Sequence, residues 1–187
     1  RLGAVGYLKQ ETRTTVAPVA AYLEKQLGRT VRLFMYPSYN DVVVRIAQGE
    51  LDLAILPPIV HLHAADTLPV RTLAYGVYSN RCFTYNALLL ARKGDAKIRT
   101  LSDLKGQKVA FVDLLSASGY VYPKLALEKD GPGAKSVQDK FYGNHVDALH
   151  ALDEGEVAAA AVYDQMFEEM GEGKIKLDNY HVLARKG

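Results

Sequence analysis

The sequence is short of several residue types and motifs, and each shortage excludes something. It has one cysteine, Cys82, so an internal disulfide is impossible, and it has no tryptophan. No apolar run approaches the roughly 20 residues that span a bilayer. No G-x-x-x-x-G-K-[ST] motif for nucleotide phosphates is present. The 23 Lys and Arg residues are scattered and nearly balanced by 21 Asp and Glu, so nothing indicates a nucleic-acid partner.

Catalytic and metal-binding patterns are also scarce. His61 and His63 are two residues apart, which puts them on different faces of a helix, and no Cys or carboxylate cluster supports them as ligands. Ser118 and His145 could serve as a nucleophile and a base, but there is no G-x-S-x-G elbow and no marked acid partner. We therefore expect no metal, no cofactor and no enzymatic activity.

What the sequence does contain is a regular alternation of short apolar runs and amphipathic segments, in a chain of 187 residues that is 49% hydrophobic. Strands are expected at 2–7, 31–36, 53–56, 85–91, 109–113, 137–142, 157–162 and 180–184. Helices are expected at 15–27, 39–48, 100–104, 120–129, 146–153 and 165–170, and one more begins at Pro57–Pro58. This order predicts an α/β fold with mainly parallel sheets and helices on their faces.

The turn with the most polar groups follows the expected strand 109–113. In parallel α/β sheets, ligands bind at the carboxyl ends of strands. Here the strand runs into Ser116-Ala117-Ser118-Gly119 and then a helix, whose first N–H groups are unpaired and carry partial positive charge. Two hydroxyls and a glycine that allows close approach would suit an anion. The alternative is that Ser116 or Ser118 only caps the helix.

Three further turns carry candidate groups. Tyr39 follows Ser38 at a helix start, where it could aim its hydroxyl at a ligand or simply pack. His145 follows a Gly-Asn turn, where it could donate to an anion or lie exposed on the surface. The turn that contains Asp164 offers both donors and acceptors, but the carboxylate could equally cap a helix.

Four sequence blocks between about residues 30 and 165 match the motifs of a known family. They are Tyr36-Pro-Ser-Tyr39 with Gly49-Glu-Leu-Asp52-Leu-Ala54, Ser102-Asp-Leu-Lys-Gly106, Asp113–Pro123 with its Ser-Ala-Ser-Gly turn, and Gly143-Asn-His145 with Gly155-Glu-Val157. Together they resemble the periplasmic substrate-binding proteins of phosphonate, phosphite and phosphate ABC transporters. The chain departs from that family at Ala117, where the family has Thr, at Pro57-Pro58 in place of Gly-Pro, and at Ala158 in place of Asp.

The resemblance implies a type II periplasmic-binding fold, with two lobes and a ligand cleft between them. Lobe one would comprise residues 1–79 and the returning residues 180–187, and lobe two residues 80–179. Ala117 and Gly119 would offer backbone N–H groups. The ligand-binding residues carried over by position, with Asp164 as a substitute for a family acid, are Tyr39, Tyr85, Ser116, Ala117, Ser118, Gly119, His145 and Asp164.

The function implied is capture of a small oxyanion by a monomer, in the periplasm or tethered to a membrane outside the cytoplasm, for an ABC transporter permease. The alternative is a ligand-sensing domain of a membrane receptor with the same fold. The chain starts at Arg1 without Met, so we expect that any signal peptide has been removed. It is shorter than the family, which indicates a fragment or a compact version.

Overall fold

The computed structural model describes residues 1–6, 11–77, 84–169 and 175–187. The chain divides into two compact units, Arg1–Arg71 (unit 1) and Thr72–Gly187 (unit 2), which we describe separately. The lobe boundary expected between residues 79 and 80 falls at 78–83, outside the described residues.

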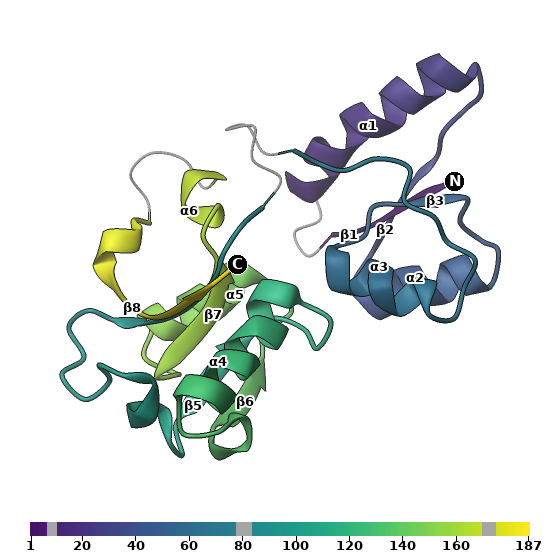
Figure 1. Ribbon diagram of the computed structural model, residues 1–187. Coiled ribbons are helices and arrows are strands. Elements are labelled where there is room, and N and C mark those ends of the chain that lie inside the picture. Colours follow the sequence, from purple (N-terminus) through teal and green to yellow (C-terminus); the bar gives the residue numbers. More distant parts are fainter. Residues whose placement is uncertain (7–10, 78–83, 170–174) are drawn as a thin grey trace. The chain divides into compact units, whose positions relative to one another are not determined.

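Unit 1 is a three-stranded parallel sheet with helices (Figure 1). Strand β1 lies in the middle and pairs with β2 and β3. In chain order, the elements are β1 (Leu2–Val5), α1 (Glu11–Leu27), β2 (Leu33–Tyr36), α2 (Tyr39–Ala47), β3 (Leu53–Ala54) and α3 (Pro58–Ala65). The β-α-β-α-β order expected from the sequence is confirmed.

Alternation along β1 explains how its core forms. Leu2 and Ala4 lie on the same face of the strand and are buried with Val16 and Ala20 of α1, which are four residues apart on one helix face. Helix α2 begins at a Ser38 cap and contacts β1 and β2. Its buried residues, which form its apolar face, are Tyr39, Val42 and Val43.

Unit 2 is built on a five-stranded sheet of order β6-β5-β7-β4-β8. Strand β5 is parallel to β6 and β7, whereas β4 is antiparallel to both β7 and β8. In chain order, its elements are β4 (Ala87–Arg92), η1 (Leu101–Leu104), β5 (Lys108–Phe111), η2 (Ala117–Val121), α4 (Tyr122–Asp130), η3 (Ala134–Ser136), β6 (Gln138–Phe141), α5 (His145–Asp153), β7 (Ala159–Tyr163), α6 (Met166–Glu169), η4 (Leu177–Asn179) and β8 (Tyr180–Lys186).

Both faces of this sheet are covered by helices, α4 on one and α5 on the other (Figure 1). Leu88 and Leu90 of β4 pack on the α5 side, and Leu89 and Ala91 pack on the α4 side. Because successive strand residues point to opposite faces, a strand between two helices must be apolar throughout, which the Ala87–Ala91 run satisfies.

The place of β8 corrects one expectation. We expected residues 180–187 to return to lobe one, but β8 pairs with β4 along its length, with a register shift between Leu89 and Leu90. The reason is hydrogen bonding: β4 is buried and has β7 on one edge only, so its other edge requires a partner. Strand β8 supplies that partner, and Lys93 Nζ donates to the Asp178 carbonyl at 3.1 Å beside it.

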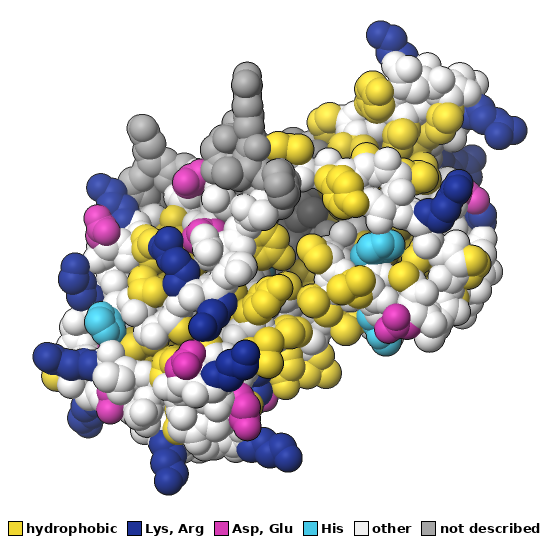
Figure 2. All heavy atoms as spheres, viewed as in Figure 1, with side chains coloured by type: hydrophobic (Ala, Val, Ile, Leu, Met, Phe, Trp, Pro, Cys, Tyr) yellow, Lys and Arg dark blue, Asp and Glu magenta, His cyan; other side chains and the backbone are white. Residues whose placement is uncertain are grey.

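The surface carries charges of both signs. On the face shown in Figure 2, Lys and Arg side chains are scattered with Asp and Glu between them and do not form one basic patch. Among the helices of the described part, none has both the length and the apolar character that a membrane crossing requires.

Candidate functional site

The Ser116–Gly119 turn forms the start of a helix, as the sequence predicted. Ser116 is the N-cap of η2, and its Oγ accepts a hydrogen bond from the Gly119 N–H at 3.0 Å. The Val121 N–H donates to the Ser116 carbonyl at 3.0 Å, five residues earlier, whereas the bonds of an α-helix join residues four apart. The sequence did not predict this π turn, a feature that is frequent at functional sites.

Position 119 has no room for a side chain, so it requires glycine. A Cβ placed there would lie 2.5 Å from Val112 Cβ and 2.8 Å from Ser116 Oγ, closer than real Cβ contacts. The Gly119 N–H is occupied by Ser116, which differs from our expectation that it donates to a ligand. The physical reason is the cap itself: a serine at the N-cap takes an N–H of the first turn.

Ser118 is 3% exposed and hydrogen-bonds Tyr85, which enters from the segment before β4. Burial raises the pKa of the Tyr85 phenol, and nearby Tyr122 adds to this, while the Ser118 bond lowers the pKa. This contact ties the segment before β4 to the start of η2.

The turn before α5 lies beside the serine turn, and both bond to the same residue. The Val112 N–H donates to the Gly119 carbonyl at 3.1 Å, and the Val112 carbonyl accepts from the Gly143 N–H at 3.0 Å. Gly143 has φ of 80°, and Asn144 then caps α5 by accepting from the Asp147 N–H at 2.8 Å. The end of β5 thus fixes both turns at one edge of the sheet.

His145 is the first residue of α5, and its ring meets Tyr163 edge-on with centroids 4.7 Å apart. Tyr163 in turn meets Tyr85 edge-on at 6.1 Å. Burial lowers the pKa of His145 to about 4, and a hydrogen bond to the Ala161 backbone opposes that shift. The histidine is therefore neutral at neutral pH.

With the chain links from Gly143 to His145 and from Ser118 to Gly119, these contacts close into a ring, which we call the serine–histidine ring: Ser118, Tyr85, Tyr163, His145, Val112 and Gly119. All its members belong to unit 2. The sequence identified Ser118, Gly119, Tyr85 and His145. It also singled out the turn that contains Tyr163, but it predicted Asp164 as the ligand-binding residue of that turn.

Asp164 follows Tyr163, but its carboxylate has a local partner. One oxygen accepts from the Asn86 N–H at 2.9 Å and the other from the Asn86 side-chain amide at 2.6 Å. These bonds tie the end of β7 to the start of β4. They explain a carboxylate at this position, and a role for Asp164 in ligand binding stays a prediction.

Tyr39 lies in unit 1. It is 8% exposed and is the first residue of α2, after Ser38, whose Oγ accepts from the Asp41 N–H at 3.2 Å. Ser38 therefore caps α2. A contact between Tyr39 and a ligand stays a prediction.

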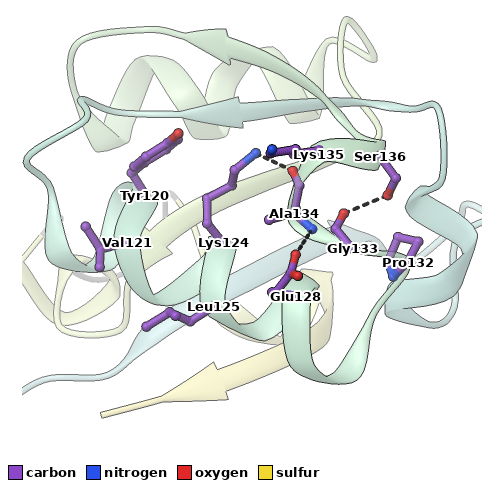
Figure 3. A pocket seen from close by; sticks show the side chains of 10 residues that line it. All are labelled: Tyr120, Val121, Lys124, Leu125, Glu128, Pro132, Gly133, Ala134, Lys135 and Ser136. Atoms are coloured by element: carbon purple, nitrogen blue, oxygen red, sulfur yellow. Dashed lines mark hydrogen bonds between the residues drawn. The ribbon is translucent and has the colours of Figure 1, made fainter.

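A surface hollow of about 840 Å³ lies elsewhere in unit 2, along α4 and the loop that follows it (Figure 3). Two lysines line it, Lys124 and Lys135, and Lys124 Nζ donates to the Ala134 carbonyl at 2.6 Å and to Asp139 at 2.8 Å. Glu128 accepts from the Ala134 N–H at 2.7 Å. None of the predicted site residues lines this hollow, so we place the candidate site at the serine–histidine ring.

The groups at the ring are hydroxyls, backbone N–H groups of a helix start and a neutral imidazole. No cluster of three or more His, Cys, Asp or Glu side chains suited to a metal occurs in the described part of the chain. Helix-start N–H groups and hydroxyls instead favour an oxyanion.

These features define a class, the type II periplasmic binding proteins, whose solved members include several similar structures. Residues 6–186 match the family described as ABC transporter, phosphonate, periplasmic substrate-binding protein, and the chain belongs to that family. The fold class and family expected from the sequence are confirmed.

Individual relatives agree with this assignment. The phosphate-import protein PhnD of Mycolicibacterium smegmatis is 28% identical over 85% of this chain, which spans 53% of that relative. A binding-protein component of a Pseudomonas aeruginosa ABC phosphonate transporter has a TM-score of 0.83 at 19% identity, over 98% of this chain and 63% of that one. PhnD1 of Prochlorococcus marinus, solved with methylphosphonate, has a TM-score of 0.80 at 18% identity, over 99% of this chain and 71% of that one.

Proposed function

We propose that this chain binds a small phosphorus oxyanion, a phosphonate, phosphite or phosphate, and that the whole protein delivers it to an ABC transporter permease outside the cytoplasm. The role is binding without turnover. The chain spans about half the length of its curated relative, so uptake and the permease partner belong to the proposal.

The observation that carries the proposal is the serine–histidine ring. The Ser118 hydroxyl and the Ala117 and Ser118 N–H groups all lie in the first turn of η2, where N–H groups have no intrahelical partner. Hydrogen bonds to an anion are roughly twice as strong as those between neutral groups. A few convergent donors therefore suffice to bind a small oxyanion.

Tyr39 is part of the same proposal, as a further ligand-binding hydroxyl for the anion that binds at the start of η2. Relatives whose names refer to phosphonate transport and phosphate import support this ligand class.

The test is calorimetry of the purified chain with methylphosphonate, phosphite, phosphate and sulfate. We expect saturable binding of at least one phosphorus oxyanion. A folded sample that releases no heat with any of them contradicts the proposal.

A further inference from the structure

An exposed tyrosine lies one helical turn after the start of η2. Tyr122 follows η2 and is the first residue of α4, and its backbone N–H donates to the Ala117 carbonyl, five residues earlier. The two helices are therefore continuous, and Tyr122 comes one turn after Ala117 and Ser118. Its side chain is 39% exposed, whereas Ser118 is 3% exposed. The helix thus presents an aromatic surface next to the proposed anion site.

The direction of helical side chains places the Tyr122 side chain toward that site. The Cα–Cβ bonds of a helix tilt toward its N-terminus, so a long side chain covers the turn that precedes its own residue. For Tyr122 the preceding turn is the start of η2, which carries the Ala117 and Ser118 N–H groups. The Tyr122 phenol also lies near the Tyr85 phenol, whose pKa it helps to raise, and Tyr85 is the partner of Ser118.

The Tyr122 side chain has an unoccupied aromatic face. Within the described part of the chain it makes no contact with another aromatic ring and no cation–π contact. The neighbouring tyrosines differ, because Tyr85 meets Tyr163 edge-on and Tyr163 meets His145 edge-on. Tyr122 therefore has apolar surface to offer to a ligand.

A phosphonate needs such a surface. It carries a carbon substituent where phosphate has a fourth oxygen, and a carbon group gains nothing from the N–H groups and hydroxyls that bind the oxygens. It gains instead from apolar surface that it removes from water. At the start of η2, the exposed face of Tyr122 supplies surface of that kind.

We infer that the aromatic face of Tyr122 forms a wall of the site, against which the carbon substituent of a phosphonate packs while the start of η2 binds the oxygens. Tyr122 then distinguishes an alkyl phosphonate from phosphate, whose fourth group is polar. This inference rests on the proposed function and narrows its ligand to phosphonates with an apolar substituent.

The first test is calorimetry of the wild-type chain with phosphate, methylphosphonate, ethylphosphonate and propylphosphonate in one buffer. A fully buried methylene raises affinity about fourfold. Against a single aromatic face, we expect a rise of roughly two- to fourfold for each added methylene, and the weakest binding for phosphate. Affinity that stays constant or falls along the series, or phosphate that binds more tightly than all three phosphonates, overturns the inference.

Variants then locate the contact. Tyr122→Ala should still bind methylphosphonate, but ethylphosphonate and propylphosphonate should bind within about twofold of it, because the wall is gone. Tyr122→Phe keeps the aromatic face and should keep the wild-type series. The matched control is Leu125→Ala, because Leu125 is 46% exposed on the same helix, and this variant should also keep the series. A Tyr122→Ala protein that retains the full rise contradicts the inference.

The outcomes remain distinguishable. Thermal melting establishes that each variant is folded, and the wild-type series is decisive if Tyr122→Ala does not fold. If no phosphorus oxyanion binds, the proposed function fails together with the inference. If these anions bind with affinities that do not depend on the substituent, the proposed function stands and only the inference fails.

Discussion

At the residue scale, the two serines of one turn have different tasks. Ser116 is occupied as a helix cap, because its Oγ accepts from the Gly119 N–H. Ser118 is equally buried, and its hydroxyl hydrogen-bonds the Tyr85 phenol. From the sequence, either serine could have been the cap, and only the geometry separates them.

The Ser118→Ala substitution tests this division. A lost charge-assisted hydrogen bond weakens binding by roughly 1.5–3 kcal/mol, or about ten- to a hundredfold. We expect that loss of phosphonate affinity with a small change in the melting temperature of the free protein. Ser116→Ala should instead lower the free energy of unfolding by about 0.5–2 kcal/mol. A destabilised Ser118→Ala protein with unchanged affinity would show that Ser118 is structural.

Gly119→Ala tests whether space at the turn is as limited as the contacts indicate. The new methyl would lie 2.5 Å from Val112 Cβ, so the turn must shift. Overpacking of this kind costs about 1–3 kcal/mol of stability, and we expect phosphonate affinity to fall with it. Gly94→Ala, with no atom within 4 Å of its added Cβ, is the matched control and should leave both unchanged. Equal behaviour of the two variants in urea unfolding would contradict the account.

At the scale of elements, the sequence predicted nearly every helix and strand because periodicity and caps are local signals. Leu88–Ala91 is apolar at every position, and that run alone predicts a strand covered on both faces. What it does not specify is the neighbour on each edge, because any extended segment can satisfy backbone bonds. The pairing of β8 with β4 was therefore missed, and so was the π turn at Ala117–Val121, which depends on how Gly119 packs against Val112.

The tie between β7 and β4 gives a prediction at this scale. Asp164→Ala removes the acceptors of the Asn86 backbone N–H and side-chain amide, which are partly buried and then lose these partners. The free energy of unfolding should fall by about 1–3 kcal/mol. Affinity for a phosphonate should change less than in Ser118→Ala. A large loss of affinity with unchanged stability would instead place Asp164 at the ligand.

At the scale of the whole molecule, the serine–histidine ring belongs entirely to unit 2, from Tyr85 to Tyr163. The sequence located most of this ring because its residues follow strands at one sheet edge. It could not specify which hydroxyls and amides are already bonded, since this depends on contacts between distant segments such as Tyr85 and Ser118. We therefore expect the ligand to bind at the start of η2 in unit 2.

Amide NMR of the chain during titration with methylphosphonate tests this claim most directly. We predict saturable shifts that are largest at the Ala117 and Ser118 N–H groups and extend to His145, with little change around Lys124 and Lys135 in the surface hollow. Shifts centred on that hollow, or none at the start of η2 when binding saturates, would contradict the account.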